Sequence, residues 1–183
     1  MEAKFPLTIE NGLGEKIIFL GLESTPEGDR VINEGYAQPG GGPPMHTHFK
    51  QDEGFTVVSG KLGYQTFGQA AKYAGPGESV VFKRGTPHRF WAEGEEPLHI
   101  KGWLQPANNI VFFLSALYAA QKKSGNHRPE KFDAAFLLTR YASEFDLVEL
   151  PGFVKKVVLP ITFFIGRLLG KYDHFKDAPE PVR

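Results

Sequence analysis

Short apolar runs recur with regular spacing along residues 1–105, and this spacing limits the folds that the chain can adopt. Turn sequences rich in Gly and Pro separate the runs about every eight to twelve residues, without a long helical period between them. The runs cover residues 5–10, 16–22, 30–37, 53–58, 62–67, 79–82, 87–93 and 98–104. This pattern predicts a β-sandwich or β-barrel rather than a parallel sheet with helical crossovers.

Residues 106–183 carry a helical pattern instead. Their first apolar residues recur at the spacing of one helix face and predict a helix over 110–122. We expect two further helices over 129–145 and 151–172. The last of them should be broken or kinked at Pro160, which cannot donate a backbone hydrogen bond.

The chain is therefore predicted to be mainly β, with a β-barrel over residues 1–105 and a helical C-terminal extension over 106–183. The most apolar stretch of the extension, 157–169, contains Arg167 and is too short to span a bilayer. Three interpretations stay open for it. It packs on the barrel or forms a homodimer interface, which is the default because the extension needs a core; it contacts a membrane peripherally; or it covers the barrel mouth as a lid.

Composition excludes several kinds of site. The chain has no Cys, which excludes disulfides, iron–sulfur centres and a Cys nucleophile. Its 21 Lys and Arg balance 21 Asp and Glu, so we expect no nucleic-acid partner. The chain has no run of about 18 apolar residues, so we expect no membrane-spanning helix. Residues 1–12 lack the apolar core of a secretory signal, so we expect a cytoplasmic location.

Three His and one Glu form the most informative polar pattern. His46 and His48 are two residues apart, so an extended chain places both imidazoles on one side. Glu53 follows at a distance that allows a turn and a return strand, and His88 begins another predicted strand. If they meet inside a barrel, three imidazoles and a carboxylate would form a site for one divalent transition metal ion.

The spacing around these residues resembles the first signature segment of the cupin superfamily. The matching residues are Gly40, His46, His48, Glu53 and Gly60. The second signature segment is matched by Gly77, Gly85 and His88, whereas Lys83 and Ala92 stand where the family usually has Pro and Asn. These two departures affect turn residues and none of the four candidate ligands.

The resemblance covers about residues 15–105 and implies a cupin jelly-roll barrel, or double-stranded β-helix, of the single-barrel type. It also implies that His46, His48, Glu53 and His88 are the metal ligands. Three neutral imidazoles and one carboxylate suit Fe, Mn, Zn or Ni, and the residue types do not select among these metals.

Strand parity predicts the walls of a substrate pocket beside the ligands. If the ligand side chains point inward, alternate residues on the same and neighbouring strands do so too. The residues predicted to line the pocket are Phe55, Leu62, Tyr64, Phe82 and Phe90. Such an apolar, aromatic cavity suits a small, partly apolar organic substrate with an oxygen that can reach the metal.

Three functions are compatible with this site. The leading hypothesis is a metal-dependent dioxygenase, an activity that is frequent in the family that the chain resembles. A non-redox metal-dependent isomerase or lyase would use the same ligands for Lewis-acid or proton-transfer chemistry. A non-catalytic cupin that binds a small molecule is the third. The sequence has no evident helix-turn-helix segment, which argues against a transcription regulator.

Overall fold

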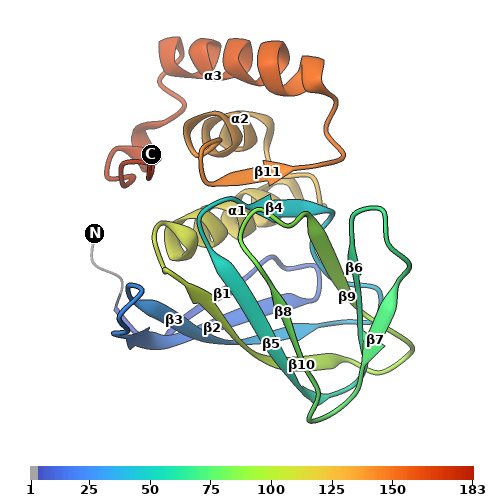
Figure 1. The fold of residues 1–183 in the computed structure, drawn as a ribbon. Helices are drawn as coiled ribbons and strands as arrows, with labels where there is room; N and C mark the ends of the chain where they lie inside the picture. The colour runs from blue at the N-terminus through green and yellow to red at the C-terminus, as the bar shows by residue number, and fades with distance from the viewer. Residues whose placement is uncertain (1–3) are drawn as a thin grey trace.

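Two antiparallel β-sheets face each other and form the expected jelly-roll barrel (Figure 1). The computed structural model describes residues 4–183. The expectation that residues 1–12 form no secretory signal therefore falls partly on residues 1–3, which lie outside the described part. One sheet has the strand order β1-β2-β3-β10-β5-β8, and the other has the order β11-β4-β9-β6-β7. The strands are β1 Leu7–Glu10, β2 Glu15–Glu23, β3 Arg30–Ala37, β4 His46–His48, β5 Asp52–Ser59, β6 Leu62–Thr66, β7 Lys72–Ala74, β8 Ser79–Phe82, β9 His88–Ala92, β10 Leu98–Gln105 and β11 Phe145–Leu147.

Each of the apolar runs predicted as a strand coincides with a strand of the barrel, with ends that differ by at most two residues. The strands β4, β7 and β11 lie outside the predicted runs. These strands have only three residues each, which is too short for alternation of apolar and polar residues to be recognised.

The barrel core lies between the two sheets and consists of side chains that alternate inward along the strands. On β5, Phe55 and Val57 are buried while Thr56 between them is exposed. The core of the barrel contains Ala37, Phe55, Val57, Leu62, Ala74, Val80, Phe82, Ala92, Leu98 and Ile100, with Tyr64 and Phe90 partly buried against it.

Three α-helices follow the barrel: α1 (Ile110–Ser124), α2 (Lys131–Arg140) and α3 (Leu159–Leu168). The first covers the predicted segment 110–122 and ends at Ser124. The next residue, Gly125, has a left-handed backbone (φ 70°), and its N–H donates a hydrogen bond to the Gln121 carbonyl of the last turn. A second hydrophobic core joins the helices to the first sheet. Its buried members are Phe19, Val31, Leu104, Ala107, Ile110, Phe113, Phe136, Leu137, Tyr141, Phe145 and Phe175.

The predicted helix over 129–145 is too long. It ends at Arg140, and the chain then turns through the fully buried Tyr141 into β11, which pairs with β4. The long-range pairing of Phe145 with His48 overrides the helical spacing of the sequence. Residues 106–183 therefore also contribute one strand to the barrel.

The last predicted helix is irregular before Pro160, as expected. A π-helical turn, η1 (Val154–Val158), precedes α3, and Pro160 lies in the first turn of α3. Because Pro160 cannot donate to the preceding turn, the helix widens there instead of continuing regularly. A short 3₁₀ turn, η2 (Asp173–Phe175), follows α3.

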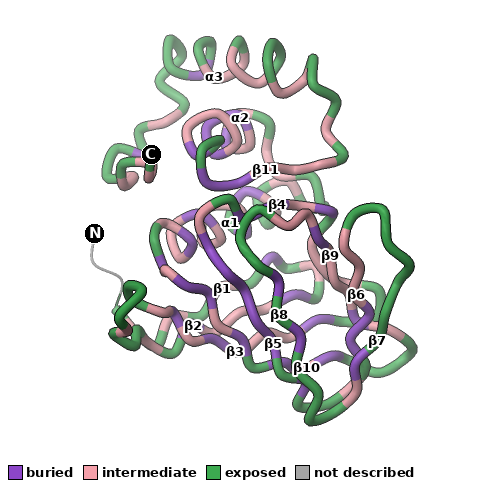
Figure 2. Tube along the Cα trace, in the orientation of Figure 1, coloured by how far each residue is buried: buried purple, intermediate pink, exposed green. Residues whose placement is uncertain are grey.

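The helices are layered outward from the barrel in the order α1, α2, α3 (Figure 1). Buried residues are concentrated in the barrel and in α2, whereas α3 is largely exposed or partly buried (Figure 2). Among residues 4–183, no helix combines the length and the apolar character that are needed to cross a membrane.

Candidate metal centre

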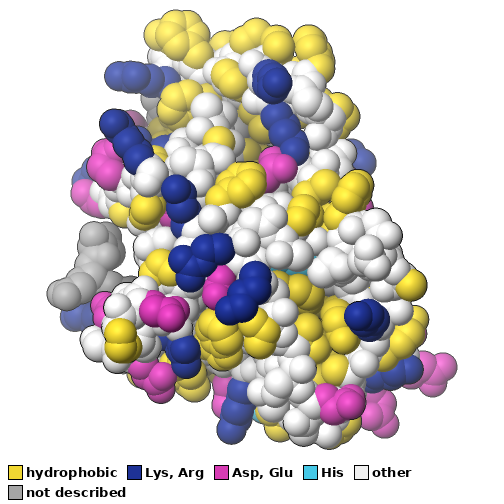
Figure 3. All heavy atoms as spheres, viewed as in Figure 1, with side chains coloured by type: hydrophobic (Ala, Val, Ile, Leu, Met, Phe, Trp, Pro, Cys, Tyr) yellow, Lys and Arg dark blue, Asp and Glu magenta, His cyan; other side chains and the backbone are white. Residues whose placement is uncertain are grey.

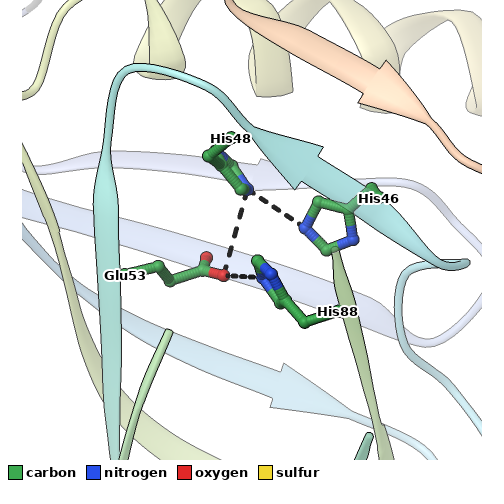
Figure 4. Close-up of side chains that lie close together, drawn as sticks. All are labelled: His46, His48, Glu53 and His88. Carbon is green, nitrogen blue, oxygen red and sulfur yellow. Dashed lines mark hydrogen bonds and ion pairs between the residues drawn. The ribbon is translucent and has the colours of Figure 1, made fainter. Parts of the chain in front are cut away.

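Four candidate ligands converge from both sheets of the barrel (Figure 4). His46 and His48 lie on β4, and His88 is the first residue of the neighbouring strand β9, directly opposite His46. Glu53 reaches them from β5 in the other sheet. Since Thr47 lies between the two His of β4, both imidazoles face the same side, as the sequence predicted.

The glycine-rich segment before β4 brings this strand close to β9. Gly42 has a φ of +151°, and a Cβ atom at this position would lie 2.1 Å from the Phe90 carbonyl oxygen. A larger residue would therefore push the two strands apart. Glycine at this point lets the chain enter β4 in contact with the strand that carries His88.

The distances between the ligand atoms fit a single metal ion. His46 Nε2 lies 3.0 Å from His48 Nε2, and His88 Nε2 lies 2.8 Å from Glu53 Oε2. His48 Nε2 lies 3.9 Å from Glu53 Oε2, and all four ligand atoms lie within 4.8 Å of one another. Metal–ligand bonds of about 2.1 Å place two ligand atoms about 3.0 Å apart at a right angle and about 4.2 Å apart when they are opposite. The three separations of 2.8, 3.0 and 3.9 Å lie in or close to this range, whereas the outer limit of 4.8 Å for the whole cluster is slightly wider.

The Nδ1 atom of each imidazole has an oxygen partner. The partners are the Pro44 carbonyl for His46 (2.8 Å), Gln51 Oε1 for His48 (3.2 Å) and the Thr86 carbonyl for His88 (2.8 Å). A carbonyl oxygen only accepts hydrogen bonds, so Nδ1 of each ring carries the proton. In a neutral ring, Nε2 then has a free lone pair, and these lone pairs meet at the centre of the cluster.

Desolvation favours the neutral form of two of the imidazoles, those of His46 and His48. Desolvation, with the neighbouring imidazoles acting in the same direction, lowers the pKa of His46 to about 3. Burial also lowers the pKa of His48. For Glu53, burial raises the pKa, but the surrounding imidazoles outweigh this effect and lower it. Near pH 7 the cluster therefore contains the neutral imidazoles of His46 and His48 and the ionised carboxylate of Glu53, a donor set that fits a divalent cation.

Two aromatic side chains hold the imidazoles in place. Phe82 stacks on His88 with the ring centroids 4.0 Å apart, and Phe145 packs edge-on against His48 at 5.5 Å. Phe145 belongs to β11 and is itself packed against Phe113 of α1. The helical extension thus forms part of the candidate site, and the sequence contains no local pattern that could have shown it.

A charged turn lies beside Glu53. Asp52 accepts hydrogen bonds from the backbone and side chain of Arg84 and from Lys83 Nζ, which join β5 to the turn between β8 and β9. Burial raises the pKa of Asp52, but these bonds outweigh it and lower the pKa to about 2. Lys83, which replaces the usual Pro of the family, therefore ties this turn to β5 through an ion pair.

The residues predicted to line a substrate pocket lie together between the sheets. Phe55, Leu62 and Phe82 are buried, and Tyr64 and Phe90 are partly exposed at the edge of the same cluster. Phe55 and Phe90 are 4.6 Å apart between ring centroids. The role of these five residues as a pocket lining stays a prediction.

Two other polar residues lie near the candidate ligands or on a neighbouring strand. Gln51 connects His48 to the Ala107 carbonyl, to which it donates a hydrogen bond of 2.9 Å. His99 lies on β10, stacks on Tyr36 and pairs with Glu34, so it is not part of the cluster.

Comparisons with known proteins match parts of this chain. Residues 36–104 match a family model described as a cupin domain. Solved structures that match part of this chain include an uncharacterised double-stranded β-helix protein of Klebsiella pneumoniae, at 20% identity and a TM-score of 0.45, covering 59% of this chain and 80% of that one. KdgF of Halomonas sp. has 20% identity and a TM-score of 0.45, covering 54% of this chain and 85% of that one.

Two curated relatives match part of the chain. The probable oxidoreductase virH of Hypocrea virens is 34% identical over 67 residues, which are 36% of this chain and 31% of that protein. The oxidoreductase iacF of Pestalotiopsis fici is 36% identical over 70 residues, which are 37% of this chain and 34% of that protein. The similarity thus spans about a third of the length of each relative.

Proposed function

Since residues 36–104 belong to the cupin superfamily, we propose that His46, His48, Glu53 and His88 bind one divalent transition metal ion and that the protein is a metal-dependent dioxygenase. Its substrate is a small, partly apolar organic molecule with an oxygen atom that can approach the metal. The names of the two partial relatives, both oxidoreductases, support the redox class over the other two hypotheses.

The convergence of lone pairs carries the proposal. His46 Nε2 and His48 Nε2 face each other at 3.0 Å while both rings use Nδ1 as the donor to other groups. Two lone pairs at this distance repel each other unless a cation lies between them. The carboxylate of Glu53 adds a negative charge to the same point, so a cation at the centre would remove the repulsion among all four groups.

When bound, a redox-active divalent metal would exchange electrons with dioxygen and polarise an oxygen of the substrate. The chain itself holds the imidazoles in one tautomer through their Nδ1 partners, and Phe82 and Phe145 exclude water from two of the rings. In a dioxygenase both atoms of O₂ enter the product, so the substrate supplies all four electrons. This stoichiometry requires no separate reductant.

Metal binding is tested first. The purified protein is loaded anaerobically with Fe(II), and its metal content is measured by mass spectrometry for the wild type, His88→Ala and His99→Ala. His99 is the matched control because it is a partly buried imidazole that pairs with a carboxylate outside the cluster. We expect loss of iron only in His88→Ala; retention of iron in this variant would refute the ligand assignment.

The reaction class is tested next with the iron-loaded protein. Nitric oxide, a probe for an accessible coordination position, should give the EPR signal of a high-spin iron–nitrosyl complex. A panel of small aromatic and aliphatic compounds with ionisable oxygens is then screened for O₂ consumption, and ¹⁸O₂ should place two labelled atoms in the product. Turnover without O₂ in the Zn- or Ni-loaded protein would favour the isomerase or lyase, and a bound compound without turnover would favour a binding protein.

Three further expectations remain part of this proposal. We propose residues 1–105 as the barrel domain and 106–183 as its extension, with β11 as the exception that joins the two. A homodimer and a cytoplasmic location stay predictions. Gel filtration with light scattering tests the homodimer, and fractionation of the source cells tests the cytoplasmic location.

A further inference from the structure

Helix α3 is the outermost element of the protein and packs through one face only (Figure 1). Its inward face lies on α2, where Phe163 contacts Phe136 and the buried Gly166 lies next to Tyr172 and Phe132. The sequence left open whether this stretch packs on the barrel, contacts a membrane or covers the barrel mouth. In the structure α2 separates it from the barrel, so it is not a lid.

The opposite face of α3 and of the preceding turn is apolar and exposed. Its five members follow one another at intervals of four, four, three and four residues, which place them on one side of a helix. They are Phe153, Val157, Ile161, Phe164 and Leu168, and their exposed fractions range from 37% to 71%. Ile165 and Leu169 extend the same face and are also exposed. We call these seven residues the α3 face.

An apolar face of this kind is unusual in a water-soluble surface. A surface helix normally directs its apolar side inward and charged residues outward. Here both sides of α3 are apolar, and the outward side includes Phe164 at 61% and Leu168 at 71% exposure. Contiguous apolar patches with a polar rim typically mark sites that contact another protein or a lipid.

The rim of the α3 face is basic. Residues 151–172 contain four Lys and Arg and no Asp or Glu. Lys155 pairs with Asp146 at 2.7 Å, whereas Lys156, Arg167 and Lys171 are exposed and form no ion pair among the described residues. Figure 3 shows hydrophobic side chains along the top of the molecule, where α3 lies, with Lys and Arg side chains among them.

We propose that the α3 face docks on an anionic lipid surface. Its apolar residues would enter the boundary between headgroups and acyl chains while Lys156, Arg167 and Lys171 contact the lipid phosphates. The ten residues of α3 extend about 15 Å, half the thickness of a bilayer core of about 30 Å, so the helix would lie along the surface.

The charges favour a lipid surface over a second copy of the chain. A two-fold symmetric contact places the same surface patch of both copies face to face. Each copy would contribute three unpaired cations and no carboxylate from residues 151–172, so the two basic rims would repel each other. An anionic bilayer instead supplies the opposite charge along the whole rim.

The test is sedimentation of the full-length protein with vesicles of phosphatidylcholine alone or of phosphatidylcholine mixed with phosphatidylglycerol. We expect binding to the mixed vesicles, weakened by high salt because screening reduces the attraction. Phe164→Ser and Leu168→Ser should each lower the vesicle partition coefficient about tenfold, and Arg167→Glu by a similar factor. Phe67→Ser is the matched control, since Phe67 is equally exposed but lies on the turn between β6 and β7.

Several outcomes would overturn the proposal. Absence of binding to mixed vesicles would do so, as would an equal loss of binding in Phe67→Ser. Equal binding to both vesicle types would overturn the role of the basic rim. If light scattering shows a dimer that Phe164→Ser converts to a monomer while vesicles remain unbound, the α3 face is an interface between two copies.

A fluorescence experiment avoids dependence on variants that lose apolar residues. Phe164→Trp places a probe on the α3 face, and Phe67→Trp places one on the barrel. Mixed vesicles should shift the emission of the Phe164→Trp protein to the blue relative to the wild type, which has Trp91 and Trp103 in the barrel. The Phe67→Trp protein should show no such shift; a shift in this protein alone would place the membrane contact elsewhere.

Discussion

Replacing Gln51 with Leu should weaken metal binding without removing a ligand. Gln51 is 1% exposed and connects two parts of the structure: its Oε1 accepts from His48 Nδ1, and its Nε2 donates to the Ala107 carbonyl. Leu has a similar size but no acceptor, so His48 loses the bond that directs its Nε2 lone pair to the centre. Partners of this kind typically change metal affinity by about 10- to 100-fold.

The effect on stability follows from this change in affinity. At a free metal concentration 100-fold above the wild-type Kd, binding stabilises the wild type by about 2.7 kcal/mol. At the same concentration, a variant with 10- to 100-fold weaker affinity is stabilised by only about 1.4 to 0.4 kcal/mol. For a chain of this size, each kcal/mol corresponds to a shift of about 2–4 °C in Tm.

The apo protein should also lose about 1–3 kcal/mol, because the buried His48 Nδ1–H has no acceptor in the variant. The Ala107 carbonyl still accepts a hydrogen bond from the backbone N–H of Ile110, so losing the hydrogen bond from Gln51 adds little to this destabilisation. The metal-dependent part is therefore obtained by comparing the Tm of each protein with and without metal. A chelator competition assay at constant pH measures the Kd directly.

Gln105→Leu is the control for this prediction. Gln105 is also buried and uses both ends of its amide, accepting from Arg30 and donating to Thr25, but it does not contact the cluster. We expect its substitution to lower the Tm of the apo protein and to leave the metal Kd unchanged. A wild-type Kd in Gln51→Leu, or an equal loss of affinity in Gln105→Leu, would show that the tautomer of His48 does not determine affinity.

Further predictions concern the ligands, the pH dependence and the contact with β11. Glu53→Ala and His48→Ala should lose most of the bound metal, as measured by mass spectrometry after dialysis; unchanged content in both would contradict the assigned site. The apo protein should lose stability as the pH falls from about 6.5 towards 3, because His46 binds a proton at a higher pH in the unfolded chain than in the folded protein. In this range the free energy of unfolding should fall by about 1.4 kcal/mol per pH unit for this imidazole. Urea unfolding across this range checks it, and a flat profile would contradict the low pKa of His46 in the folded protein. Phe145→Ala should lower the free energy of unfolding by about 3–5 kcal/mol, since Phe145 packs on both His48 and Phe113; a loss below about 1 kcal/mol in chemical denaturation would contradict this packing.

The strands and the candidate ligands could be predicted because they depend on local rules. The alternation of buried and exposed residues along β5, and the turns between strands, are properties of a few consecutive residues. The same rule places His46 and His48 on one side of β4. The resemblance to cupins then associated Glu53 and His88 with them, and the structure brings all four together.

Contacts between distant segments could only be read from the tertiary structure. Phe145 belongs to a stretch with helical spacing, and its pairing with His48 depends on where α1 and α2 place the chain. Gln51 follows His48 closely in the sequence, but its partner Ala107 belongs to the start of the helical extension. Likewise, residues 157–169 are apolar on all sides, so their periodicity could not indicate which side packs on α2 and which remains exposed. Whether a side chain is buried depends on which other residues the tertiary structure packs against it. The sequence alone identifies the apolar side chains but not these neighbours.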